Sequence, residues 1–130
     1  MRLVTEIQID WNDLDAFGHV NNLAILRYVQ TSRVHVCEEA NLMAGSNRPD
    51  CGPILAATGC RYLRPLYYPG VIRVESHVSE VKHTSFLIQH TIFDEAGNIA
   101  ATAEDVLVYF DYLQDVKIPI PDALRARLSA

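Results

Sequence analysis

The segment over residues 22–44 is the feature that most constrains how this chain can fold. Apolar and small side chains recur in it at intervals of three and four residues, which is typical of one face of an α-helix. These residues are Ile25, Val29, Ser32, Val36, Ala40 and Met43. Further apolar side chains widen the stripe around the helix, at Leu23, Leu26 and Tyr28. A helix this apolar has to be largely covered by other parts of the chain.

Residues at both ends of this segment favour a helix of that length. Asn21 or Asn22 can cap its start, because an asparagine side chain accepts hydrogen bonds from the free amides of the first turn. Gly45 follows Ala44, and glycine is common directly after the end of a helix. The Gly-Ser-Asn-Arg-Pro-Asp run over residues 45–50 then predicts a loop.

The rest of the chain supplies strands that can cover the helix. Residues 3–11 alternate between two sides, which predicts a half-buried strand. One side of this strand holds Leu3, Thr5, Ile7, Ile9 and Trp11. After the helix, apolar runs separated by turn residues predict four more strands. They cover residues 54–64, 72–79, 85–93 and 99–111.

The C-terminal residues follow a different pattern. Pro119 and Pro121 exclude a central strand there, because proline cannot donate to a strand ladder. Asp122 opens a short amphipathic helix that runs to Leu128. The order of one strand, a long helix and four antiparallel strands therefore predicts an α+β fold. The edges of such a sheet, and the face that one helix leaves bare, favour dimerisation.

The length and charge of the chain argue against several classes of protein. A chain of 130 residues suits one domain, over residues 1–130. The net charge of −5 argues against a nucleic-acid partner, which needs a basic face. No apolar run reaches the length of a membrane span, and Glu6 and Asp10 interrupt any signal peptide. We therefore expect a cytoplasmic protein with no membrane partner. The histidines and cysteines show no zinc-site spacing, and we expect no cofactor.

The loop over residues 13–22, which precedes the helix, is the segment that points to chemistry. Unpaired N–H groups and the positive end of the helix dipole can stabilise negative charge on a carbonyl oxygen there. A carboxylate in the same loop could attack the carbonyl carbon or activate water. On spacing alone, however, an aspartate before a helix is more often a cap or turn residue. By this reasoning Asp13 is structural, and a backbone-bonded His19 is commoner than a catalytic base.

Motifs along most of the chain resemble one family. The first is Asp13-x-Asp15-x-x-Gly18-His19-Val20-Asn21-Asn22, followed by Leu26-x-Tyr28 and Arg33. The later ones are Tyr62-Leu63-Arg64-Pro65-Leu66, Pro69-Gly70, Thr84-Ser85-Phe86, Asp94-x-x-Gly97 and Ile118-Pro119-Ile120-Pro121 with Leu124-Arg125. In this order they resemble the hot-dog acyl-CoA thioesterases of the 4-hydroxybenzoyl-CoA thioesterase-like branch, over roughly residues 5–128.

The resemblance implies a hot-dog fold, in which a five-stranded antiparallel sheet wraps around one long helix. It implies a homodimer joined edge to edge, with active sites at the interface, and pairing of dimers into a homotetramer. The implied activity is hydrolysis of an acyl-CoA thioester to a free acid and CoA. The family's catalytic carboxylate matches Asp15, and its oxyanion-stabilising amide matches Asn22. Whether such a carboxylate attacks directly or through water varies within the family.

The resemblance also implies residues that contact the substrate. Around the thioester they are Gly18, His19, Val20 and Asn21. The phosphates of CoA need cations, for which Arg64 is a candidate, and the resemblance favours the turn formed by Lys82, His83, Thr84 and Ser85. The chain departs from the family where many relatives carry a helix glutamate, since Gln30 and Thr31 stand there, and where Ile25 replaces a tyrosine. Asp15 is then the carboxylate on which the chemistry depends.

Two other functions are compatible with the same fold, because a fold does not determine a function. The first is an acyl-CoA binding module without catalysis. The second is a hot-dog dehydratase acting on 3-hydroxyacyl thioesters, which needs a histidine paired with an acidic residue. Neither the His-Phe-x-Gly run nor the Asp-x-x-Pro-x-His run of such enzymes is present, and only His19 lies near the predicted site.

Overall fold

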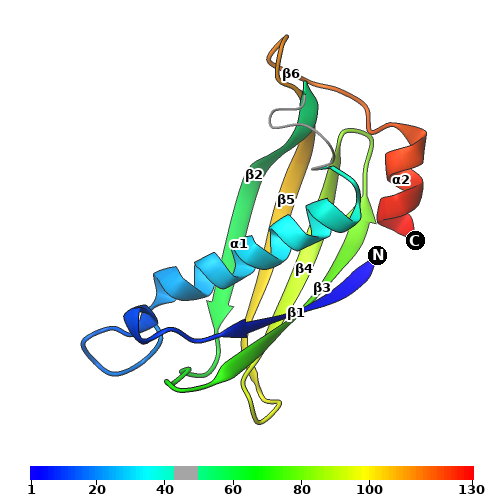
Figure 1. The fold of residues 1–130 in the computed structure, drawn as a ribbon. Helices are drawn as coiled ribbons and strands as arrows, with labels where there is room; N and C mark the ends of the chain where they lie inside the picture. Colours follow the sequence, from blue (N-terminus) through cyan, green and yellow to red (C-terminus); the bar gives the residue numbers. More distant parts are fainter. Residues whose placement is uncertain (43–49) are drawn as a thin grey trace.

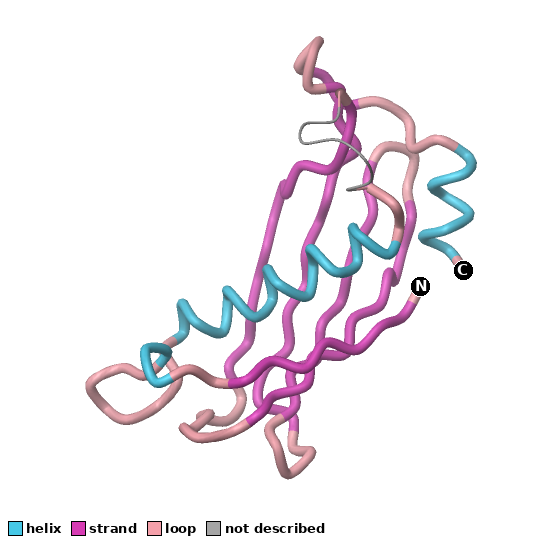
Figure 2. Tube along the Cα trace, viewed as in Figure 1, coloured by secondary structure: helices cyan, strands magenta, loops and turns pink. Residues whose placement is uncertain are grey.

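The computed structural model describes residues 1–42 and 50–130. In chain order the strands are β1 (Arg2–Gln8), β2 (Cys51–Tyr62), β3 (Val71–Val81), β4 (Ser85–Phe93), β5 (Ile99–Asp111) and β6 (Val116–Lys117). The helices are the 3-10 helix η1 (Trp11–Asp13) and the α-helices α1 (Asn22–Glu39) and α2 (Asp122–Ser129). Figure 1 shows α1 crossing one face of the sheet, and Figure 2 shows the same arrangement with helices and strands distinguished.

The sheet is antiparallel and has the order β1-β3-β4-β5-β2, with β6 paired to the end of β5. The α+β prediction is therefore confirmed, and the five predicted strands correspond to β1 to β5. The description as five strands around one helix is incomplete, because β6 adds a sixth short strand and α2 a second α-helix. α2 is the short C-terminal helix that the sequence predicts.

The long helix starts as predicted but ends earlier. Asn21 is its N-cap, and the Asn21 side chain accepts a hydrogen bond of 2.8 Å from the Leu23 amide. After Glu39, Asn41 takes a left-handed conformation with φ of 62°. The Leu42 amide then bonds to the Cys37 carbonyl at 2.8 Å, the pattern of a Schellman motif. An asparagine therefore ends the helix. The predicted end, at Ala44 and Gly45, lies outside the described residues, as does Met43.

The first strand is also shorter than predicted, because the chain turns after Gln8. Asp10 accepts a hydrogen bond of 2.8 Å from the Asn12 amide and thereby caps η1. Ile9 still reaches the core, but Trp11 leaves the alternation and is 68% exposed. Leu23 is 66% exposed, so it does not widen the buried stripe of α1. Strand alternation missed the turn at Trp11 because the Asp10 cap redirects the chain there, and helical periodicity did not show that Leu23, in the first turn of α1, is exposed.

The core lies between α1 and the inner face of the sheet, in two clusters. The first half of α1 contributes Ile25, Tyr28 and Val29 to the cluster above β3 and β4. The second half of α1 packs with Phe86 and Ile88, and α2 closes that cluster. The remaining buried apolar residues of the second cluster are Val36, Cys37, Ala40, Leu42, Leu107, Ile120, Leu124 and Leu128.

A buried polar network ties the middle of α1 to the sheet. Asp105 of β5 is fully buried and accepts hydrogen bonds from Arg33 of α1 at 3.1 Å and from Thr58 of β2 at 2.7 Å. Nε2 of His90 lies 2.9 Å from the same carboxylate, and Nδ1 of His90 lies 2.7 Å from the Ser76 hydroxyl. Since a carboxylate only accepts, Nε2 of His90 donates to Asp105. Burial raises the pKa of Asp105, but the bonds from His90 and Thr58 and the charges nearby lower it further than burial raises it.

The outer edge of β2 and the sheet face opposite α1 are among the surfaces left uncovered within residues 1–42 and 50–130. The outer edge of β2 pairs with no strand there, and Ile54, Leu55 and Tyr62 of β2 are 40%, 38% and 48% exposed. No helix covers the sheet face opposite α1 (Figure 1). Among the described helices, none is long and apolar enough to cross a lipid bilayer.

Candidate active site

The loop between η1 and α1 folds back on itself as a narrow turn. The Asn21 amide bonds to the Asp13 carbonyl at 2.7 Å, Leu14 and Val20 form an isolated bridge, and the Asp15 amide bonds to the His19 carbonyl at 2.8 Å. Gly18 closes the turn with φ of 84°, a conformation that residues with a Cβ atom rarely adopt. The Val20 amide also bonds to the Leu66 carbonyl at 2.8 Å, which ties the loop to the segment after β2.

One carboxylate oxygen of Asp15 is held, and the other is free to act. Oδ1 accepts hydrogen bonds from the Phe17 amide at 2.8 Å and from the His19 amide at 3.3 Å. Oδ2 accepts none from the residues that the structure describes. The side chain is half-buried, so water and a ligand can reach it. This arrangement orients the carboxylate while leaving an oxygen for proton transfer or attack.

The start of α1 supplies hydrogen-bond donors beside this carboxylate. The Asn21 side chain satisfies the Leu23 amide. Within the described part of the chain, the Asn22 amide has no acceptor. Such an amide at a helix N-terminus, reinforced by the helix dipole, is suited to bind an oxygen that becomes negatively charged.

A cavity of about 310 Å³ brings the predicted residues together. It is lined by Asp15, His19, Val20, Asn22, Ile25, Tyr62, Leu63, Arg64 and Pro65. Gly18 and Asn21 shape its loop without lining it. Sequence reasoning did not place Leu63 and Pro65 here, although they belong to one of the family motifs. The end of β2 forms one wall, so the cavity lies next to the uncovered edge of the sheet.

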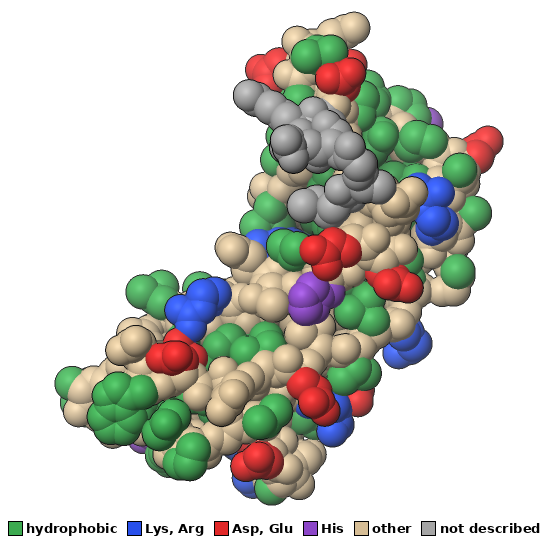
Figure 3. Space-filling model, viewed as in Figure 1, with side chains coloured by type: hydrophobic (Ala, Val, Ile, Leu, Met, Phe, Trp, Pro, Cys, Tyr) green, Lys and Arg blue, Asp and Glu red, His purple; other side chains and the backbone are tan. Residues whose placement is uncertain are grey.

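Tyr62 and Arg64 give this cavity polar groups beyond those of the loop. Burial, together with the neighbouring Cys60 thiol, raises the pKa of Tyr62, and a hydrogen bond with the Asn22 side chain acts in the opposite direction. Arg64 is exposed at the rim. Hydrophobic side chains gather around this end of the molecule (Figure 3), where Trp11, Phe17 and Leu23 are 68%, 84% and 66% exposed.

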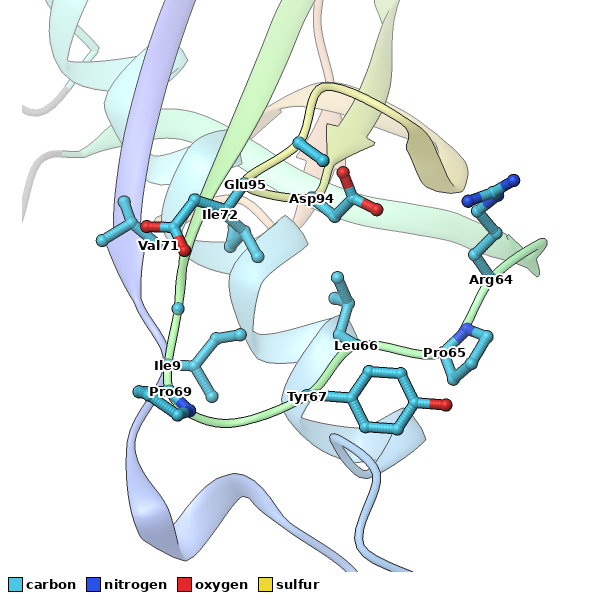
Figure 4. A pocket seen from close by; sticks show the side chains of 12 residues that line it. Ile9, Arg64, Pro65, Leu66, Tyr67, Pro69, Val71, Ile72, Asp94 and Glu95 are labelled. Carbon is cyan, nitrogen blue, oxygen red and sulfur yellow. The ribbon is translucent and has the colours of Figure 1, made fainter.

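A second cavity, of about 570 Å³, is lined in part by the segment that follows β2 (Figure 4). Figure 4 shows Ile9 and Ile72 on one side, Arg64 on the other and Leu66 between them. Arg64 and Pro65 line both cavities, but no residue of the 13–22 loop lines the second one. It is the larger of the two, yet the smaller one holds the carboxylate and the free amide.

The predicted CoA-binding turn lies at the opposite end of the sheet. Lys82, His83 and Thr84 connect β3 to β4, close to α2, whereas α1 begins at the far end (Figure 1). α2 and the chain before it hold this turn, through bonds from Arg125 to the Lys82 carbonyl at 2.8 Å and from the Ile120 amide to the His83 carbonyl at 2.9 Å. Within one chain, the structure therefore does not bring Lys82 to Ser85 together with Asp15.

Asp13 does not line the cavity, which agrees with a structural role. Its side chain is buried beneath the loop, where it contacts Tyr28 and Arg27 of α1. His19 stacks edge to face on Tyr67 with ring centroids 5.4 Å apart. Over residues 1–42 and 50–130, no group of three or more His, Cys, Asp or Glu side chains is arranged to hold a metal ion.

The fold and the cavity define a hot-dog domain of the thioester hydrolase class. The chain belongs to the thioesterase-like superfamily, whose model matches residues 9–128. None of the curated proteins matches the sequence significantly.

Solved structures share this fold. A candidate thioesterase of Pseudomonas aeruginosa, PA2801, is 25% identical with a TM-score of 0.85, and the match covers 95% of each chain. A predicted thioesterase of Bacillus stearothermophilus is 22% identical with a TM-score of 0.89 over 99% of this chain and 95% of its own. The Synechocystis protein Slr0204, a 1,4-dihydroxy-2-naphthoyl-CoA thioesterase, is 16% identical with a TM-score of 0.87 over 99% of this chain and 96% of its own.

Proposed function

We propose that this protein hydrolyses acyl-CoA thioesters, with Asp15 as base or nucleophile and the Asn22 amide as the group that binds the carbonyl oxygen. The observation that carries the proposal is that Asp15 and Asn22 line one cavity, and that within residues 1–42 and 50–130 Oδ2 of Asp15 and the Asn22 amide have no hydrogen-bond partner. A carboxylate and a hydrogen-bond donor are the two groups that acyl transfer from a thioester needs.

In the route through water, Asp15 takes a proton from a water molecule whose oxygen attacks the thioester carbonyl carbon. Negative charge develops on the carbonyl oxygen and is stabilised by the Asn22 amide. The carbon–sulfur bond then breaks, the proton passes to the CoA sulfur, and the free acid and CoA leave. In the direct route, Asp15 displaces CoA and forms a mixed anhydride that water hydrolyses. Both routes use the same two groups.

We further propose that two chains pair through the outer edge of β2. Antiparallel pairing about a two-fold axis would place the Cys51 end of one β2 beside the Tyr62 end of the other. The Cys51 end lies at the same end of the sheet as Ser85, because Cys51 pairs with Asp111 and Ser85 with Val108. The Lys82–Ser85 turn of one chain would then face the Asp15 cavity of its partner, where cations can meet the phosphates of CoA. The uncovered outer sheet face would allow two dimers to pair into a tetramer.

A panel of acyl-CoAs, spanning short, long and aromatic acyl groups and read by release of free thiol, tests this function. The wild-type protein should release thiol from at least one of them. Asp15→Asn should keep the fold and the oligomeric state but lower kcat by about 100-fold or more, the scale of a lost catalytic base. Glu6→Gln is the control, because Glu6 is an exposed carboxylate of β1, the edge strand opposite β2, and it should keep wild-type turnover. Undiminished turnover in Asp15→Asn would remove Asp15 from the mechanism, and tight binding without thiol release would favour a binding module.

A further inference from the structure

Asp13, two residues before the proposed catalytic carboxylate, is buried and forms a cluster with Tyr28 and Arg27 of α1. It is 4% exposed. Its Oδ2 accepts hydrogen bonds from the Tyr28 hydroxyl at 2.6 Å and from the Asp10 amide at 2.9 Å, and its Oδ1 accepts one from Arg27. The Arg27 guanidinium also lies over the Tyr28 ring, 5.9 Å from its centroid. A buried carboxylate is costly unless donors surround it in this way.

These partners keep Asp13 charged. Burial raises the pKa of Asp13, but the bonds from Tyr28, the Asp10 amide and Arg27 lower it further, so its pKa lies below the ordinary value. The same contact, together with burial, raises the pKa of Tyr28, which stays a phenol that donates to Asp13. The hydrogen bonds of Asp13 to Tyr28 and Arg27 therefore tie the loop to the second turn of α1.

Asp13 is linked to the proposed catalytic groups through the backbone. Its carbonyl accepts the amide of Asn21, the helix cap, at 2.7 Å. The next rungs of the same short ladder are the Leu14–Val20 bridge and the Asp15–His19 bond of 2.8 Å. Asp15 thus lies two residues from a fixed point, and Asn22 follows directly on the residue that Asp13 holds.

We propose that Asp13 is a positioning residue: through Tyr28 and Arg27 it sets the place of Asp15 relative to the Asn22 amide, so that both face one cavity. This inference rests on the proposed thioesterase function. Without the tie, the loop would still be capped by Asn21 but could slide along the start of α1, and the distance between the carboxylate and the amide would vary. Neither Asp13 nor Tyr28 lines the Asp15 cavity, so neither acts on the substrate itself.

The decisive variant is Tyr28→Phe, which removes one buried hydroxyl and leaves the ring in the core. We expect kcat to fall by about 10- to 100-fold with KM changed by less than about threefold, since a displacement near 1 Å of a catalytic group can cost about 100-fold. Asp13→Asn should lower kcat at least as far. Ser76→Ala is the matched control, because it also removes one buried hydroxyl bonded to a titratable side chain, the Ser76–His90 bond of 2.7 Å. It should keep kcat within about twofold.

A second measurement does not depend on substrate. Hydrogen exchange of the Phe17 and His19 amides, both bonded to Asp15, should accelerate in Tyr28→Phe and stay unchanged in Ser76→Ala. Unchanged exchange and kcat in Tyr28→Phe, or an equal loss of kcat in Ser76→Ala, would overturn the positioning role. A wild-type protein that releases no thiol would overturn the proposed function instead, while the exchange rates would still decide whether Asp13 places Asp15.

Discussion

Replacing Asp105 by alanine is the most direct test of the buried network that joins α1 to the sheet. The carboxylate accepts bonds from Arg33, Thr58 and His90. Its loss leaves the Arg33 side chain, only 14% exposed, and the fully buried His90 without their acceptor. Breaking a buried ion pair by removing one partner costs about 3–5 kcal/mol. Against a total of about 5–15 kcal/mol for a domain, this is a large share of the stability.

Urea unfolding followed by circular dichroism, at one fixed protein concentration, measures this loss. A thermal scan should show a midpoint lower by about 10–20 °C, from about 3–5 °C per kcal/mol for a chain of this size. Glu104→Ala is the control, because Glu104 is the exposed neighbour on the same strand, and it should change stability by less than about 0.5 kcal/mol. A loss below about 1 kcal/mol for Asp105→Ala would refute the reasoning, since it would mean that the network contributes no net stability.

The stability loss caused by Asp105→Ala should also depend on pH. The pKa of Asp105 in the folded protein lies below the ordinary value of 3.8, because hydrogen bonds from His90 and Thr58 outweigh its burial. A group whose pKa is lower in the folded state stabilises fully above its unfolded pKa and loses that contribution as the pH falls through the folded value. The part of the stability difference between wild type and Asp105→Ala that comes from this carboxylate should therefore shrink as the pH falls below about pH 4.

Two further predictions follow from the loop and from the sheet edge. Gly18→Ala should lower the unfolding free energy by about 1 kcal/mol, because alanine is strained at a φ of 84°. Gly59→Ala is the control and should not lower it, because Gly59 has open space around it and no positive φ. Equal losses in the two variants would contradict this prediction. Ile54→Lys on β2 should shift the dimer toward monomers in sedimentation velocity, whereas Val4→Lys on β1, the opposite edge strand, should not. A wild-type protein that is monomeric would exclude pairing through β2.

Much of the fold could be predicted because its signals are local. Alternation along residues 72–79, 85–93 and 99–111 shows which side chains share a face, and β3, β4 and β5 formed there. The Asn21 cap was likewise predicted from a local signal. The predicted end of the long helix was wrong, because Asn41 can leave the helical conformation four residues before Gly45 and no periodicity records that choice. Trp11 was misplaced for a related reason, since the Asp10 cap redirects the chain there.

In the candidate site, too, some features follow from local sequence and others from long-range contacts. A carboxylate, a glycine and an asparagine cap before a buried helix were predictable from local signals, because turn and cap chemistry depends on neighbouring residues. Long-range packing is what brings Tyr62 and Arg64 into a cavity with Asp15, turns Asp13 toward Tyr28 and leaves the Lys82–Ser85 turn at the other end of the sheet. Contacts between residues far apart in the chain depend on how the sheet curves and how the helix crosses it, and no local pattern encodes them.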